Sequence, residues 1–297
     1  MNIILTGSLG HISKPLAEEL IAKGHGVTII SSQPGKQKDI EAAGARAAIG
    51  SINDLHFLVS AFAGADIVYL MEPPINFFDQ QLDMELYWTT IARNYAQAVR
   101  LSGVKRVIHL SSVGAHTPQG NGMLSMHHNV EKILDELPVD VSIKFMRPVG
   151  FYYNMFAFIP TIKAHNAIFQ NYGGDQKEPW VSTPDIASTI AAEMESPFEG
   201  RTVRYIASDE VSPNEVASIL GAVIGKPALQ WVVVPDEQFL NNLLAAGFNP
   251  KGAKGIADMN AGRRNGLYDD YARHRPTLGK IKLTDFATQF ATVYNQS

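Results

Sequence analysis

Two glycines near the N-terminus, Gly7 and Gly10, follow the apolar segment 2–5 and precede the amphipathic segment 14–24. A strand, a Gly-x-x-Gly turn and a helix in this order are typical of the entry to a dinucleotide-binding β-α-β unit. Glycines let phosphate oxygens approach the backbone closely, and the N–H groups and dipole at a helix start attract a pyrophosphate. The turn therefore predicts a nicotinamide dinucleotide, although α/β proteins without a nucleotide also begin with such turns.

The next apolar segment ends in Ser31, Ser32 and Gln33, where an NAD(H) site usually carries an acidic residue for the adenosine ribose. No acidic residue stands there, and Lys36 and Lys38 follow. Hydroxyl groups and nearby cations suit a 2′-phosphate, so NADP(H) is the preferred cofactor and NAD(H) the second choice. Alternatively, the two lysines are ordinary solvated residues of a loop.

Apolar strands and amphipathic helices alternate through the first half of the chain, which predicts a Rossmann-type doubly wound parallel α/β sheet. Strands are predicted at 2–5, 27–30, 47–49, 67–70, 106–110 and 141–146, and helices at 14–24, 35–43, 79–102 and 125–137. A further helix begins at Asn53, with Asp54 available to cap it. The second half is less regular: strands are predicted at 202–206 and 230–234, and helices follow Thr183 and Ser212 and cover 237–246 and 283–294.

This alternation divides the chain into a dinucleotide-binding domain, residues 1–155, to which later strands return, and a smaller α+β lobe, residues 156–297, that binds the substrate. Glycines and charges interrupt the pattern over residues 247–275, which we interpret as a mobile flap over the substrate. The helix at 79–102 offers a face for a homodimer.

In an open parallel sheet, ligands bind beyond the carboxyl ends of the strands. Residues at those ends are therefore the predicted cofactor contacts. They are Gly7, Leu9, Gly10, His11, Ile12, Ser31, Ser32, Gln33, Ser51, Ile52, Met71, Pro73, Ser111, Pro148 and Phe151.

Composition excludes several classes of protein. The 297 residues are 45% hydrophobic and 18% charged, as in a globular protein with a large core. A net charge of −4 without basic runs gives no footprint for nucleic acid. The absence of cysteine excludes disulfides, thiolate metal sites and cysteine nucleophiles. No apolar stretch has the length of a membrane span and no signal peptide is evident, so we expect a cytoplasmic protein without a membrane partner.

Four segments together resemble the NmrA-like branch of the atypical short-chain dehydrogenase/reductase family: 6–10, 68–74, 147–154 and 184–187. The third is the most specific, because Arg147-Pro148 is followed by aromatic residues and Asn154. The resemblance covers nearly the whole chain. It implies an NADP(H)-binding Rossmann domain with a small C-terminal lobe that completes a cleft. Members include quinone and dye reductases, and also regulators that bind the dinucleotide without catalysis.

The resemblance also directs attention to a departure from ordinary short-chain dehydrogenases, which use a Tyr-x-x-x-Lys pair on one helix face. In the matching window, His128 replaces the tyrosine and Lys132 keeps the lysine position. Upstream, Ser111 and Ser112 stand where the serine of the family lies. His128 is then a proton donor and Lys132 a ligand of the cofactor ribose; alternatively, both are solvated helix residues. Neighbouring His127 and His128 point about 100° apart, so no metal site is expected.

Aromatic residues after the sixth strand are candidates for an acceptor pocket. Phe151, Tyr152 and Tyr153 follow Pro148 closely, and the Tyr153 phenol is a further candidate catalytic group; alternatively, these rings only pack in the core. The function that these residues favour is an NADPH-dependent reductase that transfers hydride to a small apolar acceptor, such as a quinone or conjugated carbonyl. The alternatives are a redox-sensing regulator without catalysis and, weakened by the missing tyrosine, an epimerase or dehydratase of a nucleotide-sugar.

Overall fold

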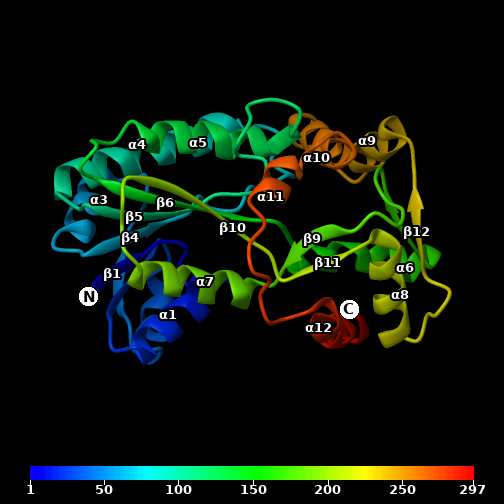
Figure 1. The fold of residues 1–297 in the computed structure, drawn as a ribbon, viewed down its shortest axis with the longest axis horizontal. Coiled ribbons are helices and arrows are strands. Elements are labelled where there is room, and N and C mark those ends of the chain that lie inside the picture. The colour runs from blue at the N-terminus through cyan, green and yellow to red at the C-terminus, as the bar shows by residue number, and fades with distance from the viewer.

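The computed structural model describes residues 1–297. Its centre is a parallel sheet of seven strands in the order β3-β2-β1-β4-β5-β6-β10 (Figure 1). The strands are β1 (Asn2–Leu5), β2 (Gly26–Ser31), β3 (Arg46–Ile49), β4 (Ile67–Leu70), β5 (Arg106–Leu110), β6 (Ser142–Pro148) and β10 (Arg201–Ile206). The strand order reverses between β1 and β4, as in Rossmann-type doubly wound sheets, so the predicted fold class is confirmed.

Helices cover both faces of this sheet (Figure 1). One layer contains α3 (Leu55–Phe62), α4 (Met84–Ser102) and α5 (Ser125–Asp135), and the other contains α1 (Ser13–Ala22) and α7 (Thr183–Glu195). A 3-10 turn (Pro34–Lys36) and α2 (Gln37–Ala42) connect β2 to β3. Each layer buries its apolar side against the sheet, which gives one hydrophobic core on either face.

The other lobe lies on the right in Figure 1 and has its own core. It holds a sheet of β7 (Gly150–Phe151), β9 (Glu178–Val181) and β11 (Asp209–Val211), and a pair formed by β8 (Ala167–Gln170) and β12 (Gln230–Val233). Its helical segments are two 3-10 helices (Gly122–Leu124 and Tyr152–Phe158), α6 (Ile159–His165), α8 (Pro213–Val223), α9 (Asp236–Ala245), α10 (Pro250–Arg263), α11 (Asp269–Arg273) and α12 (Leu283–Gln296). Because α7 and β10 belong to the large unit, two segments build the smaller lobe: β7 to β9 lie between β6 and α7, and the elements from β11 to α12 follow β10.

Three predicted elements differ from the structure. The helix predicted from residue 79 begins at Met84, because the Asp83 carboxylate caps it by accepting the N–H of Leu86. The cap of α7 is Ser182 rather than Thr183. Most of the segment 247–275 forms α10 and α11, which we did not predict, and its mobility as a flap stays a prediction.

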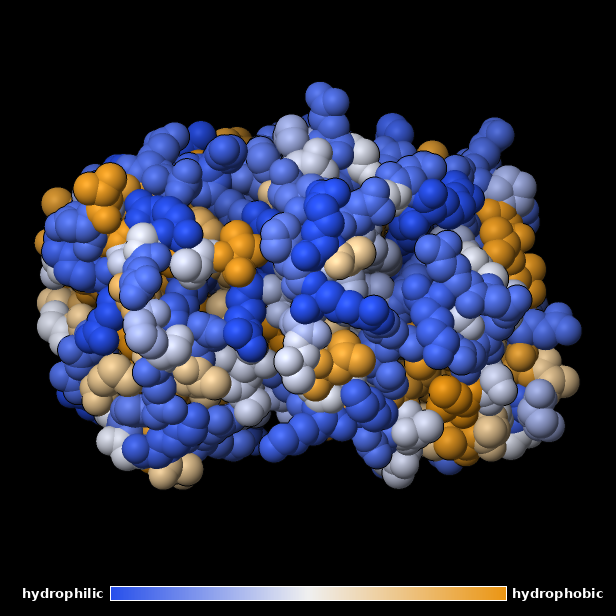
Figure 2. Space-filling model, in the orientation of Figure 1, coloured by the Kyte–Doolittle hydropathy of each residue, from blue (hydrophilic) through white to orange (hydrophobic).

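The visible face of the molecule is largely hydrophilic, with apolar residues in separate small groups (Figure 2). None of the helices combines the length and the hydrophobicity that crossing a bilayer requires. Helix α4 packs between α3 and α5, and its use in a homodimer stays a prediction.

Candidate cofactor and acceptor site

The turn after β1 has the conformation and the free groups of a phosphate site. Gly7 has φ +89°, and a Cβ built there would lie 2.4 Å from Met71 Sδ and 2.5 Å from Ser13 Oγ, so only glycine fits without rearrangement. The hydroxyl of Ser13 donates to the carbonyl of Thr6 at 3.0 Å and holds the start of α1 against the strand.

The backbone around the start of α1 is open to a ligand. No side chain caps α1, and the N–H groups of Leu9, His11 and Ile12 donate to no protein acceptor. Unpaired N–H groups at the positive end of a helix are the partners that a pyrophosphate requires. The geometry therefore fits a dinucleotide, and the tight packing around Gly7 shows why the turn needs glycine.

At the end of β2, Ser31 is buried and its hydroxyl accepts hydrogen bonds from the Ser8 hydroxyl at 3.0 Å and the Gln33 N–H at 3.2 Å. Ser32 and Gln33 are exposed. Lys36 is bound to Asp39 at 3.4 Å, and both side chains are largely exposed. The edge thus presents hydroxyl and amide groups, and no carboxylate, beside the phosphate turn.

The end of β4 is fixed by two aromatic residues of α4. The Tyr95 hydroxyl donates to the carbonyl of Met71 at 2.9 Å, and the Trp88 indole N–H donates to the carbonyl of Pro73 at 3.0 Å. The prolines that follow β4 prevent the strand from continuing. These contacts hold the predicted cofactor residues Met71 and Pro73 at the same edge of the sheet as Gly7.

A cavity of about 1080 Å³ lies at this edge, between the sheet and the smaller lobe. Twenty-two of its 33 lining residues are hydrophobic, which suits a flat apolar ligand. The lining comes from the ends of β5 and β6, from α5 and from the lobe helices α9 and α10. Helix α10, which belongs to the segment that we predicted as a flap, therefore forms part of the cavity wall.

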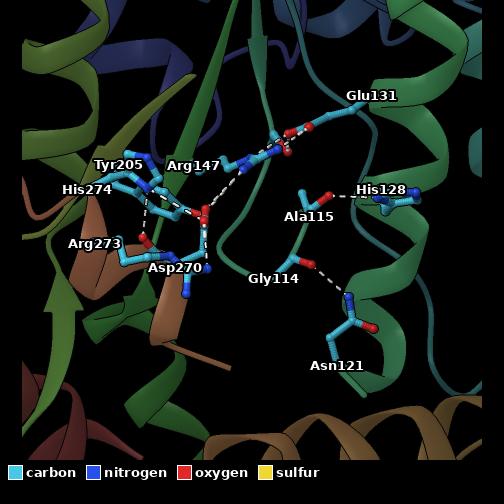
Figure 3. Close-up of polar contacts among 11 residues, drawn as sticks. Gly114, Ala115, Asn121, His128, Glu131, Arg147, Tyr205, Asp270, Arg273 and His274 are labelled. Atoms are coloured by element: carbon cyan, nitrogen blue, oxygen red, sulfur yellow. Dashed lines mark hydrogen bonds and ion pairs between the residues drawn. The ribbon is translucent and has the colours of Figure 1, made fainter. Parts of the chain in front are cut away.

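The helix α5 turns a different histidine toward this cavity from the one that we predicted. His127 lines the cavity, whereas His128 does not. Instead, the Nδ1–H of His128 donates to the carbonyl of Ala115 at 2.9 Å (Figure 3). Likewise Ser112 lines the cavity, whereas the Ser111 hydroxyl is buried against Glu131 at 2.5 Å. The roles predicted for His128 and Ser111 thus have no support from the cavity.

Of the other predicted site residues, some line the cavity and some do not. Lys132 is exposed on α5 and forms no ion pair, so its contact with the cofactor stays a prediction. Phe151 and Tyr153 both line the cavity, and the Tyr153 ring contacts the His11 ring, with centroids 4.0 Å apart and an angle of 37° between the ring planes. This contact joins the lobe to the phosphate turn. Ser51 and Ile52 lie at the end of β3, near Ser31.

His127 belongs to a buried polar group between the sheet and α4. Glu72 Oε2 lies 3.0 Å from Nε2 of the fully buried His109, and the His127 ring packs edge-on against Trp88 at 4.8 Å. Glu72 Oε1, His109 Nδ1 and His127 Nδ1 have no hydrogen-bond partner. Burial lowers the pKa of His127 to about 4, so its imidazole is neutral at pH 7. No group of three side chains here or elsewhere is suited to a metal ion.

A second buried network crosses from the sheet to the lobe (Figure 3). Arg147 on β6 donates to both oxygens of Glu131, from Nε at 2.9 Å and Nη2 at 2.6 Å, and its Nη1 lies 3.6 Å from Asp270 of α11. Burial opposes ionisation of Asp270, but the hydrogen bond from Tyr205 at 2.5 Å and the neighbouring cations hold the pKa of this carboxyl below its ordinary value. The network ties α11 to the sheet beside the cavity.

Sequence reasoning named Ser112 together with Ser111 and considered His127 only as a metal ligand, and it did not single out the Glu131–Arg147 pair. The signal that could have found His127 and Glu131 is their own four-residue spacing, which is the same as that of His128 and Lys132.

Comparisons with known proteins agree with this architecture. A model described as the NmrA-like family matches residues 1–269. An NAD(P)H azoreductase from Xenophilus azovorans is 21% identical over 239 residues, which cover 80% of this chain and 78% of that protein.

Two solved structures are similar across nearly their whole lengths. An NADPH-dependent quinone oxidoreductase from Escherichia coli, complexed with NADPH, has a TM-score of 0.81 and 22% sequence identity. The match covers 97% of this chain and 99% of the oxidoreductase chain. A triphenylmethane reductase from Citrobacter sp. has a TM-score of 0.77 and 20% sequence identity. The match covers 98% of this chain and 100% of the reductase chain. The chain belongs to the NmrA-like family.

Proposed function

We propose that this NmrA-like protein is an NADPH-dependent reductase of a flat, apolar acceptor such as a quinone or a conjugated carbonyl compound. The observation that carries the proposal is the position of the cavity. A large and mainly hydrophobic space opens at the sheet edge that also carries the phosphate turn, so an acceptor in it lies beside a dinucleotide. The named relatives are reductases of azo compounds, quinones and triphenylmethane dyes, which supports the same class of acceptor.

The geometry of the turn supports the proposed cofactor residues. The free N–H groups of Leu9, His11 and Ile12 bind the pyrophosphate, and the hydroxyl groups of Ser31 and Ser32, without a carboxylate, accommodate the 2′-phosphate of NADP(H). When bound, the nicotinamide supplies a hydride to the acceptor.

His127 is the group that stabilises the oxygen of the reduced acceptor. Its ring is neutral at pH 7 because its pKa lies near 4, and its Nε2 makes no hydrogen bond within the protein. An N–H held in an apolar cavity stabilises a developing oxyanion more than it would in water. Tyr153 lines the same cavity and offers a second hydroxyl donor.

The proposal is tested by the loss of NADPH absorbance with a panel of quinones and conjugated enones. We expect rapid oxidation with at least one acceptor, and a decrease in kcat of about 100-fold in His127→Phe. The matched control is His128→Phe, one residue along the same helix and outside the cavity, for which we expect less than about a threefold change.

A second function is favoured by one observation: the Tyr-x-x-x-Lys pair is absent, and Lys132 and His128 do not line the cavity. A redox sensor would bind NADP(H) tightly and distinguish its oxidised from its reduced form. Tight binding with no oxidation of NADPH by any acceptor would support the sensor and contradict the reductase.

A further inference from the structure

The cavity is larger than the proposed reaction requires. A six-membered ring fits a space of about 150 Å³, so a nicotinamide, its ribose and a bicyclic acceptor together need roughly 600 Å³. The cavity measures about 1080 Å³. Nearly half of its volume therefore stays empty when the cofactor and a small acceptor are bound.

The spare volume lies on the side of the smaller lobe. Ser112 and His127 come from the large unit and mark the reactive end of the cavity. The opposite end is lined by α6, β8 and α9, and α6 and α9 lie in the part of the molecule farthest from the large sheet (Figure 1). This end, which we term the distal chamber, is lined by Phe158, His165, Phe169, Phe239 and Leu243.

Helix α9 turns one face toward the distal chamber. Its lining residues recur at the four-residue spacing of a single helix face: Gln238, Phe239, Asn242, Leu243 and Ala246. Over these positions the face is about 12 Å long. Phe239 is the only buried residue of α9, and the cluster that it joins has just two other buried members, Val234 and Ala257. The protein alone thus leaves much of this apolar face uncovered.

The lining also shows which chemistry suits the chamber. Phe158, Phe169 and Leu243 are each only partly buried, so a ligand in the cavity can remove more of their apolar surface from water. Arg263 is the only lining residue with a formal charge at pH 7, and the carboxylate of Glu178 already pairs with it. An anionic group such as a diphosphate would lose its hydration there without gaining a free cation.

We propose that the distal chamber binds a hydrocarbon arm of the acceptor. The arm has roughly ten or more carbons, since the six carbons of benzene occupy about 150 Å³. The substrate class is then an amphiphilic compound with a reducible ring at one end and a long apolar substituent, rather than a small free ring. This inference deepens the proposed reductase function and rests on it for the nature of the ring. Leu243 and Phe169 act as specificity-determining residues, since they contact the arm and not the reacting atoms.

Binding to wild-type protein saturated with NADP⁺, which has no hydride to donate, gives a test that does not depend on turnover. We expect calorimetry to show that 2-decyl-1,4-naphthoquinone binds at least about 100-fold more tightly than the 2-methyl compound, because each CH₂ group that leaves water strengthens binding. A polyether arm of the same length should strengthen binding less than about threefold, because its oxygens keep their affinity for water.

Two neighbouring leucines of α9 locate the arm. Leu243 lines the chamber, whereas Leu244 does not and is 38% exposed. In Leu243→Asp, the decyl compound should bind at least about tenfold more weakly, whereas the methyl compound should change less than about twofold, which also shows that the variant is folded. Leu244→Asp is the matched control and should leave both affinities unchanged. In the wild type, the decyl compound should also slow hydrogen exchange of the α9 amides more than the methyl compound does.

The outcomes separate this inference from the reductase proposal. Equal affinities of the methyl and decyl compounds would overturn the inference even if NADPH is oxidised. A gain from the decyl arm that Leu243→Asp does not reduce would place the arm elsewhere and also overturn it. A gain that depends on Leu243, without oxidation of NADPH by any acceptor, would sustain the hydrocarbon site and refute the reductase.

Discussion

Removing either member of the buried Glu131–Arg147 pair should destabilise the protein strongly, and removing both should cost much less than the sum. Arg147 donates to both oxygens of Glu131, at 2.9 and 2.6 Å, and their side chains are only 9% and 10% exposed. Either change alone leaves a buried charge without its main partner, which costs about 3–5 kcal/mol. We therefore expect Glu131→Gln and Arg147→Met each to lower the free energy of unfolding by that amount.

The double variant tests the reasoning directly. Without either charge, the remaining cost comes from lost packing and from Asp270, which loses its contact with Arg147. The double variant should therefore lose at least about 2 kcal/mol less free energy of unfolding than the sum of the two single losses. Urea unfolding at pH 7, without dinucleotide, measures all four proteins. The control is Lys105→Met, which breaks an ion pair with Asp140 at 2.6 Å whose side chains are 57% and 61% exposed, and no measurable change is expected. Additive single effects, or single effects below about 1 kcal/mol, would refute the network as we describe it.

Three further predictions concern the cofactor edge and the cavity. The folded imidazole of His127 has a pKa of about 4 against 6.5 when unfolded, so the unfolded chain takes up the extra proton as the pH falls. The wild type should lose about 2 kcal/mol between pH 7 and pH 5 on this account, and His127→Gln should lack that loss in urea unfolding. Gly7→Ala places a Cβ 2.4 Å from Met71 Sδ and should raise the Kd for NADPH by at least about 30-fold in calorimetry, while Gly24→Ala, with φ +82° and no atom within 4 Å, should not. Ser32→Asp should lower the preference for NADPH over NADH at least about tenfold in the same assay, because a carboxylate repels the 2′-phosphate; an unchanged ratio would place that phosphate elsewhere.

The alternation of strands and helices in the Rossmann-type sheet could be predicted from the sequence, because each of these elements carries its own apolar pattern. The rotation of α5 about its own axis, which decides which of its side chains face the cavity, could not be predicted. His127 and His128 have the same residue type, and only the packing of α5 on α4 and the sheet decides which ring faces the cavity. The same holds for Ser111 and Ser112, since neighbouring residues at the end of a strand point to opposite faces.

Helix α10 was missed for a different reason. Its glycines suggested a loose segment, but in the structure they allow close packing. A Cβ on Gly255 would lie 3.1 Å from that of Met123, and one on Gly252 would lie 2.7 Å from Met84 Cε. Such contacts involve residues more than a hundred positions away, so the sequence around the glycines could not reveal them.

The last strand of the large sheet has a consequence for the synthesis of the protein. β10 pairs with β6 so that Arg201 lies opposite Ile143, a separation of 58 residues along the chain. On the ribosome, β6 therefore emerges well before its partner, and at about 5–20 residues per second the delay is roughly 3–12 s. During that time one edge of β6 has its backbone N–H and C=O groups unpaired, which favours association with other nascent chains. A chaperone that covers this edge until β10 has been made would raise the yield of folded protein, and a chain truncated at residue 155 would keep the edge exposed.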